Sequence, residues 1–261
     1  MAKPEALPRG VASGLDALAA RHGLPDEAVR RLGSLIRLVT DNPRAPTAIR
    51  DPLRVLDDHV ADSLVGLDVQ AVRHASRVVD LGSGAGFPGL PLAIALPETL
   101  FALVESEGRK CAFIEQMAQA AEAGNVKIVN ARAEAWTAGS GRFDVVTARA
   151  VAPLDVVVEY AAPLLRPGGV LVVWRGRHDK DAEDAGARAA ALIGMEPVET
   201  LAVVPYEGAR DRHLTLMSKV RSTPSRYPRR PGMASKRPLG GPRPAKSPAD
   251  RGENSSDRPR R

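Results

Sequence analysis

The chain of 261 residues has little of what marks secreted, membrane and metal-binding proteins. Its one cysteine, Cys111, allows no disulfide within the chain and no zinc site built from several thiolates. No apolar run approaches the roughly 20 residues of a membrane span, and the first residues lack the apolar stretch of a signal peptide. We therefore expect a cytoplasmic protein without membrane contact, and no metal is expected.

Aromatic side chains are also scarce, at 3% of the chain. Few residues are therefore available to stack on the bases of a nucleic acid. The candidates are Phe87, Trp136, Trp174 and Tyr206, although packing in the core is the more ordinary fate of a tryptophan.

Positive charge is scarce over most of the chain and concentrated at its end. The formal net charge is +6, but residues 219–261 hold 13 Lys/Arg against 3 Asp/Glu, which leaves a net −4 for residues 1–218. Residues 221–261 are rich in Pro, Arg, Ser and Gly, and we expect a basic disordered tail there. Its composition fits either an RNA-binding segment or a solvated basic extension of no specific role.

The apolar pattern changes near residue 76. Residues 1–75 predict a helical region packed on the main domain, with one helix over 25–40 and another whose apolar stripe runs over 53–67. Residues 76–220 alternate strands with helices, which is typical of a parallel sheet covered on both faces. Strands are expected at 77–81, 100–104, 126–129, 143–147 and 169–174, then an antiparallel hairpin at 198–204 and 213–220.

The loop after the first predicted strand carries the most chemical information. Residues 80–89 read DLGSGAGFPG, a strand-end acid followed by glycines that let a backbone approach a ligand. The spacing Gly-x-Gly-x-x-Gly fits a dinucleotide, whereas Asp-x-Gly-x-Gly-x-Gly resembles the first motif of S-adenosylmethionine-dependent methyltransferases. Asp80 would repel a pyrophosphate and attract an ammonium or sulfonium; alternatively, it caps the loop through backbone amides.

Two later strand ends add candidate binding groups. Glu105 ends the second strand, where a carboxylate can accept both ribose hydroxyls of either cofactor type. Residues 130–134 follow the third strand and could lie against an adenine, with Ala133 as a small flat surface and Glu134 as a polar contact. The order of parts resembles an α/β fold: the Rossmann-like seven-stranded methyltransferase sheet, here with an N-terminal helical extension.

Over about residues 54–219 the chain resembles one family in particular, the RsmG (GidB) guanine-N7 methyltransferases of 16S ribosomal RNA. The segments that carry the resemblance are 59–63 (HVADS), 80–91, 106–110 (SEGRK), 143–150 with its TARA, and 212–214 (RHL). The resemblance implies S-adenosylmethionine as cofactor and 16S rRNA or the small ribosomal subunit as partner. It also implies cofactor contacts from Gly82, Phe87, Ala133, Glu134 and Arg149.

The sequence departs from the pattern of this family at three places. Phe87 stands where leucine is frequent, and Glu105 stands where aspartate is frequent, so apolar bulk and charge are preserved. Arg175-Gly176 stands where a lysine-glycine pair is frequent. Arginine keeps the positive charge but not the point geometry of lysine.

The catalytic groups needed by other base methyltransferases are not in the expected places. Cys111, the one thiol, falls on the predicted helix after the second strand, which disfavours methylation of a pyrimidine carbon through a cysteine nucleophile. Residues 147–153 read TARAVAP, not the Asn/Asp-Pro-Pro-aromatic loop used on exocyclic amines. Guanine N7 has an in-plane lone pair and no proton, so its direct displacement on a sulfonium methyl needs no general base. We therefore name no catalytic acid or base.

Three other functions remain open from the sequence: a small-molecule methyltransferase on the same sheet, an NAD-dependent oxidoreductase, and a noncatalytic RNA-binding module that uses the tail. Several side chains also have two interpretations. Arg149 fits a place beside the substrate cleft or a pair with a surface acid. His59, Asp62 and Ser63 fit RNA contact or a hydrogen-bond cluster on a helix, and the pair at 109–110 fits phosphate contact or a solvated helix start.

Overall fold

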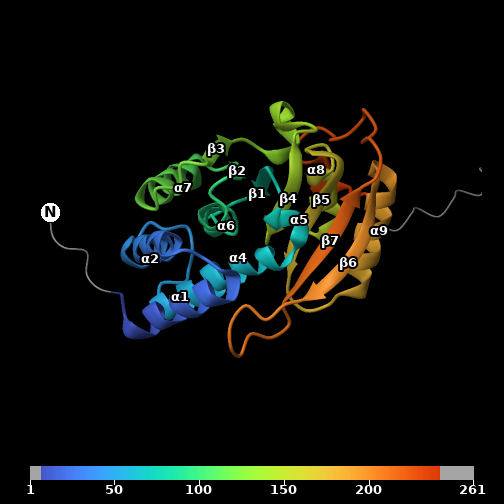
Figure 1. Ribbon diagram of the computed structural model, residues 1–261. Helices are drawn as coiled ribbons and strands as arrows, with labels where there is room; N and C mark the ends of the chain where they lie inside the picture. The colour runs from blue at the N-terminus through green and yellow to red at the C-terminus, as the bar shows by residue number, and fades with distance from the viewer. Residues whose placement is uncertain (1–6, 242–261) are drawn as a thin grey trace, which may run out of the picture.

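The computed structural model describes residues 7–241 and is built around one seven-stranded sheet (Figure 1). The strands are β1 (Arg77–Leu81), β2 (Leu100–Glu105), β3 (Val126–Asn130), β4 (Phe143–Arg149), β5 (Leu165–Arg175), β6 (Met195–Ala202) and β7 (His213–Lys219). They lie in the order β3-β2-β1-β4-β5-β7-β6. Strands β1 to β5 are parallel, and β7 is antiparallel to both of its neighbours. The predicted strands and the predicted hairpin at the sheet edge are confirmed.

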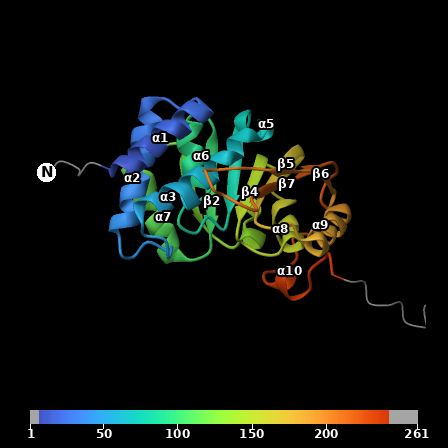
Figure 2. The ribbon, with the colours of Figure 1, turned by 90° about the horizontal axis from the view of Figure 1, so that it is seen from below.

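The central strands are apolar on both sides because they separate two cores. Val78 packs in the first core, while Val79 and Leu81 pack in the second, as expected for side chains that alternate along a strand. Helices supply the other half of each core. The first is covered by α1 (Arg9–His22), α2 (Asp26–Asp41), α6 (Gly89–Ala95) and α7 (Gly108–Ala120), and the second by α8 (Leu154–Ala161) and α9 (Lys180–Ile193). Figure 2 shows α1 and α2 at the opposite end of the molecule from α9.

The N-terminal region shares the first core with the sheet. Helix α2 confirms the helix expected over 25–40, and its first turn places Asp26 and Glu27 at the positive end of the helix dipole. Helix α1 lies within the predicted helical region 1–75, although its bounds were not predicted, and it buries Val11 and Leu15. Among residues 7–241, no helix combines the length and the apolar character needed to cross a bilayer.

The helix predicted with a stripe over 53–67 is present as one continuous helical stretch whose type changes along its length. It consists of α3 (Pro52–Val55), the π-helix η1 (Leu56–Ala61), α4 (Asp62–Leu64) and the 3-10 helix η2 (Val65–Asp68), and is followed by α5 (Gln70–Arg73). Each type of turn has a different number of residues, so positions before and after η1 do not share one straight face. Leu64 and Leu67 are buried as expected, but Leu53 is 46% exposed.

The segment predicted to be a disordered tail is folded in its first part. Residues 222–241, called the C-terminal arm below, pack on α8 and include the short helix α10 (Met233–Lys236). Arg229 donates to both carboxylate oxygens of the buried Glu159, and Tyr227 and Leu239 pack against the second core. Composition did not reveal this because a few contacts to residues far away in the sequence hold the arm. The rest of the predicted tail, residues 242–261, lies outside the described residues.

Candidate active site

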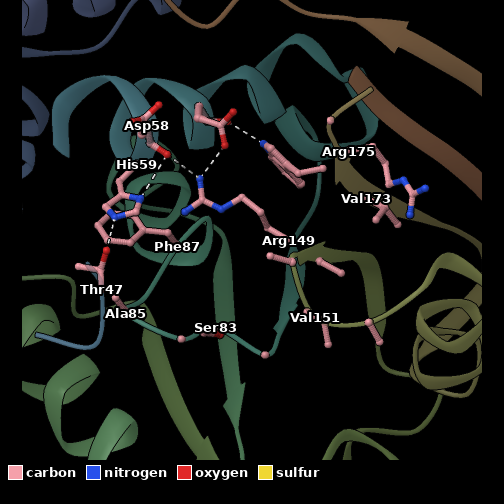
Figure 3. A pocket seen from close by; sticks show the side chains of 18 of the residues that line it. Thr47, Asp58, His59, Ser83, Ala85, Phe87, Arg149, Val151, Val173 and Arg175 are labelled. Atoms are coloured by element: carbon pink, nitrogen blue, oxygen red, sulfur yellow. Dashed lines mark hydrogen bonds and ion pairs between the residues drawn. The ribbon is translucent and has the colours of Figure 1, made fainter. Parts of the chain in front are cut away.

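A cleft of about 970 Å³ opens at the carboxyl ends of the parallel strands. It lies where the strand order reverses between β1 and β4, so that the loops following these two strands diverge. Open α/β sheets bind their ligands at this point. Residues 82–85 with Phe87 line one side, and residues 149–152 line another. Thr47, Asp58, His59 and Asp62 of the N-terminal region add a third (Figure 3).

The glycine loop after β1 is held in shape from two directions. Gly84 lines the cleft with a φ of +59°, and its N–H donates to Glu105 Oε2 at 3.1 Å. Gly89 begins α6 at a point where a Cβ atom would lie 2.9 Å from Asp80 Oδ2. Any larger residue there would push the helix away from the strand end. Gly89 therefore allows α6 to pack closely against the end of β1, and Gly84 leaves the backbone of the loop accessible from the cleft.

Asp80 lies behind this loop and is fully buried. Its carboxylate accepts hydrogen bonds from Thr147 Oγ1 at 2.8 Å and from the N–H of Gly89 at 3.3 Å. Burial raises the pKa of this carboxyl group to about 6, because the hydrogen bonds offset only part of the lost hydration. Of the two interpretations of Asp80, the geometry fits the acid that caps the loop and not an acid in contact with a cationic cofactor.

Glu105 ends β2 and faces the cleft, although it is 6% exposed. Oε2 accepts from Gly84, and Oε1 accepts from the N–H of Glu107 at 2.9 Å. Oε1 also accepts from Ser106 Oγ at 3.4 Å, whereas Oε2 has a second lone pair that can accept a hydrogen bond from a ligand. Glu105 is thus a fixed, oriented carboxylate beside the glycine loop, with Oε2 open to a ribose hydroxyl.

Phe87 is the centre of a layered group on the N-terminal side of the cleft. The His59 ring stacks on Phe87 with ring centroids 4.7 Å apart, and the Arg149 guanidinium lies 5.7 Å from the Phe87 centroid. Thr47 Oγ1 lies 2.9 Å from His59 Nε2. Burial, followed by the nearby Arg149 charge, lowers the pKa of His59 to about 4, so this imidazole is neutral at pH 7. Figure 3 shows these side chains on the same wall of the cleft.

Asp62 pairs with two of the arginines that line the cleft. Its Oδ2 accepts from Arg149 Nη1 at 2.6 Å, and its Oδ1 lies 3.5 Å from Arg212 Nε. The Asp62 backbone carbonyl accepts the Trp174 indole N–H at 2.6 Å. Asp62 therefore connects α4 with the carboxyl end of β4, with β5 and with the β6–β7 loop. Of the two interpretations offered for Arg149, it lines the cleft, but its acidic partner is a buried carboxylate and not a surface one.

Several residues of the site were not singled out from the sequence. Asp58 accepts from Tyr206 Oη at 2.7 Å and pairs with Arg54, which fixes the β6–β7 loop against the π-helix. Arg212 was seen only as part of a motif. The spacing of Asp58 and Asp62 by four residues on one helical face was the available signal for a paired acidic site. Arg175 also lines the cleft, and within residues 7–241 it has no acidic partner.

The six predicted cofactor residues fall in two places. Gly82, Phe87, Glu105 and Arg149 line the cleft. Ala133 and Glu134 form the 3-10 helix η3 (Ala133–Ala135) after β3, outside the cleft lining. Glu134 Oε1 accepts the N–H of Gly232 in the C-terminal arm at 3.1 Å, so its carboxylate is already engaged. A turn η4 (Thr137–Gly139) then leads to β4.

One group among the described residues has the composition of a metal site. Ligand atoms of His178, Glu183 and His213 lie within 4.8 Å of one another. The two imidazole rings, however, are stacked in parallel planes with centroids 4.1 Å apart. A metal ion must lie near the plane of each ring that ligates it, and two parallel stacked planes have no such common point. In this arrangement the group is a stacked histidine pair beside an acid.

A seven-stranded sheet of this order, with a glycine loop and an oriented carboxylate meeting at the strand switch point, defines a Rossmann-like S-adenosylmethionine-dependent methyltransferase. Residues 37–215 match the family described as rRNA small subunit methyltransferase G. The chain belongs to this family.

Named relatives agree with this membership. Ribosomal RNA small subunit methyltransferase G of Rubrobacter xylanophilus is 42% identical over 198 residues, which cover 74% of this chain and 76% of the relative. The protein of the same name from Chloroflexus aggregans is 41% identical over 199 residues, covering 74% and 82%. Among solved structures, one described as a predicted O-methyltransferase from Agrobacterium tumefaciens is 22% identical with a TM-score of 0.48, over 62% of this chain and 80% of that one.

Proposed function

We propose that this chain transfers a methyl group from S-adenosylmethionine to N7 of a guanine in the 16S rRNA of the small ribosomal subunit. The observation that carries the proposal is the overlap of the cleft with the family match. Every residue that lines the cleft, from Pro46 to Arg212, falls within the matched residues 37–215. The parts of the chain shared with the rRNA methyltransferases are therefore the parts that form the site.

The residues present fit the proposed cofactor. A Cβ added at Gly84 would meet nothing closer than the Gly82 carbonyl oxygen at 3.8 Å, so the backbone faces open space on the cleft side. Glu105 offers an oriented carboxylate beside this space, and Phe87 offers an apolar ring. When bound, S-adenosylmethionine supplies an electrophilic methyl group on a sulfonium. We assign Gly82, Phe87, Glu105 and Arg149 to its surroundings, and contact by Ala133 and Glu134 stays a prediction.

The chain need only align its substrates for this reaction. The N7 lone pair forms the new N–C bond while the C–S bond breaks and its electron pair stays on sulfur, so no proton moves. The residues of the cleft agree with such a step: His59 is neutral, and Asp80 is buried behind the loop. The rate enhancement would come from holding the reacting atoms close and in line.

Charge balance in the cleft also suits the product. Methylation at N7 makes the purine cationic, and an unpaired arginine beside it would oppose the reaction. Asp62 neutralises Arg149 and faces Arg212, so the positive groups nearest to the layered wall are already paired. Arg175 is the cation of the cleft that we assign to an RNA phosphate.

The test is methylation of small subunits that lack the modification. Purified protein and S-adenosylmethionine are incubated with these subunits, and N7-methylguanosine in the 16S rRNA is measured by mass spectrometry. We expect stoichiometric product with the wild type and at least a tenfold slower reaction with Arg149→Ala or Glu105→Ala. A wild-type protein that forms no N7-methylguanosine, or that methylates only free metabolites, would refute the proposal.

A further inference from the structure

The C-terminal arm, residues 222–241, carries charged side chains of one sign only. It holds five Lys/Arg and no Asp/Glu. Arg229 is committed to Glu159, and Arg226 lies over the Tyr227 ring at 5.1 Å. Arg230, Lys236 and Arg237 are exposed, and none of these three forms an ion pair within residues 7–241. These three exposed cations are therefore available to an anionic ligand.

The arm is docked on the protein and not merely attached to it. Glu159 is 1% exposed, and its two oxygens accept from Arg229 Nε at 2.8 Å and from Arg229 Nη2. Arg188 donates to the Gly240 carbonyl at 2.7 Å, and Ala234 is buried. These contacts hold the arm in its middle and at its carboxyl end. The free cations are therefore presented from a defined surface, which lowers the entropy lost when they bind.

This surface lies at the same edge of the sheet as the cleft. Gly232 of the arm donates to Glu134, which follows the carboxyl end of β3. Val157 of α8 lines the cleft, and Glu159, two residues later, holds the arm. Figure 2 shows α10 outside α8, at the end of the molecule away from α1 and α2. An RNA whose target base enters the cleft would thus have neighbouring nucleotides over the arm.

We infer that the C-terminal arm is a phosphate-binding platform for the RNA strand beside the target guanine, with Arg230, Lys236 and Arg237 as the contacting residues. The inference rests on the proposed rRNA substrate. It assigns to the arm backbone contacts, which position a nucleic acid without reading its sequence. The arm lies beyond residue 215, where the family match ends, so it adds affinity to a catalytic region that is complete without it.

The experiment compares two triple variants of the full-length protein. The test variant is Arg230→Gln/Lys236→Gln/Arg237→Gln. The control is Arg9→Gln/Arg77→Gln/Arg142→Gln, which removes the same charge from exposed positions in α1 and at the amino ends of β1 and β4. Binding to 16S rRNA is measured by filter binding at several KCl concentrations, and methyl transfer is measured on small subunits.

The test variant should bind 16S rRNA about 10- to 30-fold more weakly at 0.1 M KCl, with a salt slope smaller by about 2, because each lost phosphate contact removes roughly 0.7 from the slope for single strands. KM for subunits should rise and kcat should stay within twofold. The control should lose much less affinity. Equal affinities and slopes for the two triple variants would overturn the inference.

A second variant separates a docked platform from a loose basic tail. Glu159→Gln keeps every cation of the arm and raises the net charge by one, but it weakens the hold on Arg229. We expect faster trypsin cleavage in the arm and three- to tenfold weaker RNA binding; unchanged or tighter binding would contradict the docked platform. If the wild type fails to methylate rRNA while the arm variants still lose RNA affinity, the proposed function falls and the platform stands.

Discussion

At the scale of single residues, the site depends most on Asp62. Its side chain is 9% exposed and faces two arginines, Arg149 at 2.6 Å and Arg212 at 3.5 Å. A carboxylate so far removed from water is costly unless its partners remain in place. The pairing of Asp62 with Arg149 could not be predicted from the sequence, because 87 residues separate the two. Local spacing could suggest only that residues 59, 62 and 63 were neighbours on a helix.

The Asp62–Arg149 pair should contribute measurable coupling. In a double-mutant cycle of Asp62→Ala and Arg149→Ala, we expect a coupling energy of about 1–3 kcal/mol from urea unfolding, because both side chains are mostly shielded from water. The matched control is the Lys180–Asp184 pair, whose side chains are 86% and 53% exposed. Its cycle should give less than about 0.5 kcal/mol. Equal coupling in the two cycles would show that Asp62 is not the structural partner of Arg149.

His59 should make the stability of the protein sensitive to acid. Its pKa in the folded state is about 4, below the ordinary 6.5, so the unfolded chain binds the proton more readily. The stabilisation is fully present above pH 6.5 and is lost as the pH falls toward 4. Between pH 7 and pH 5, wild type should lose roughly 1–2 kcal/mol more than His59→Gln in urea unfolding. Parallel losses in both proteins would contradict the buried neutral imidazole.

At the scale of elements, a side chain added to the glycine loop should reduce ligand affinity more than it reduces the stability of the protein. Gly84→Ala places a Cβ on the cleft side of a residue at φ +59°, which costs about 1–2 kcal/mol of stability. We expect it also to weaken binding of S-adenosylhomocysteine, measured by calorimetry, at least tenfold. Gly23→Ala is the control, since Gly23 has φ +69° and nothing within 4 Å of an added Cβ. It should show the same stability loss with unchanged affinity.

The elements were predictable to different degrees for physical reasons. The parallel strands and α2 were predictable because their apolar pattern is set by burial within the element itself. The arm was not predictable, because Arg229 finds its partner 70 residues away. The position of Ala133 and Glu134 relative to the cleft was also beyond local pattern: it depends on how the β3–β4 connection folds against α8 and the arm.

The candidate site was predictable where one segment carried all of its parts. Residues 82–87 and Glu105 follow strand ends, and the carboxyl ends of parallel strands meet at one edge of the sheet. Asp58 and Arg212 could not be placed in the same way, because they meet only through the packing of the N-terminal region against the β6–β7 loop. The sequence shows which residue types are present at these positions, but it does not show on which side of the sheet the N-terminal region packs.

At the scale of the whole molecule, the first core joins regions that differ in sequence pattern. It runs without interruption from Val11 in α1 to Leu216 in β7. Asp62 and the Asp58–Tyr206 hydrogen bond add polar links between the N-terminal region and the later strands. Such a shared core has no surface along which the N-terminal helices could separate and leave the sheet with its own closed interior. We therefore expect one cooperative folding unit over residues 7–220 rather than two.

This expectation can be measured with one substitution in each core. Leu32→Ala in α2 removes a fully buried side chain from the first core and should cost about 2–5 kcal/mol. Trp174 contacts Asp62 of the N-terminal region, so these variants are made in a Trp174→Phe background, where the fluorescence of Trp136 reports on the second core while far-UV circular dichroism reports on all helices. In a single unit, Leu32→Ala moves both urea transitions to the same lower midpoint, as Ile193→Ala in the second core should also do. If the fluorescence midpoint of Leu32→Ala stayed at the wild-type value while the dichroism midpoint fell, the N-terminal helices would be a separate unit, and the cleft wall formed by His59 and Asp62 could open without unfolding the sheet.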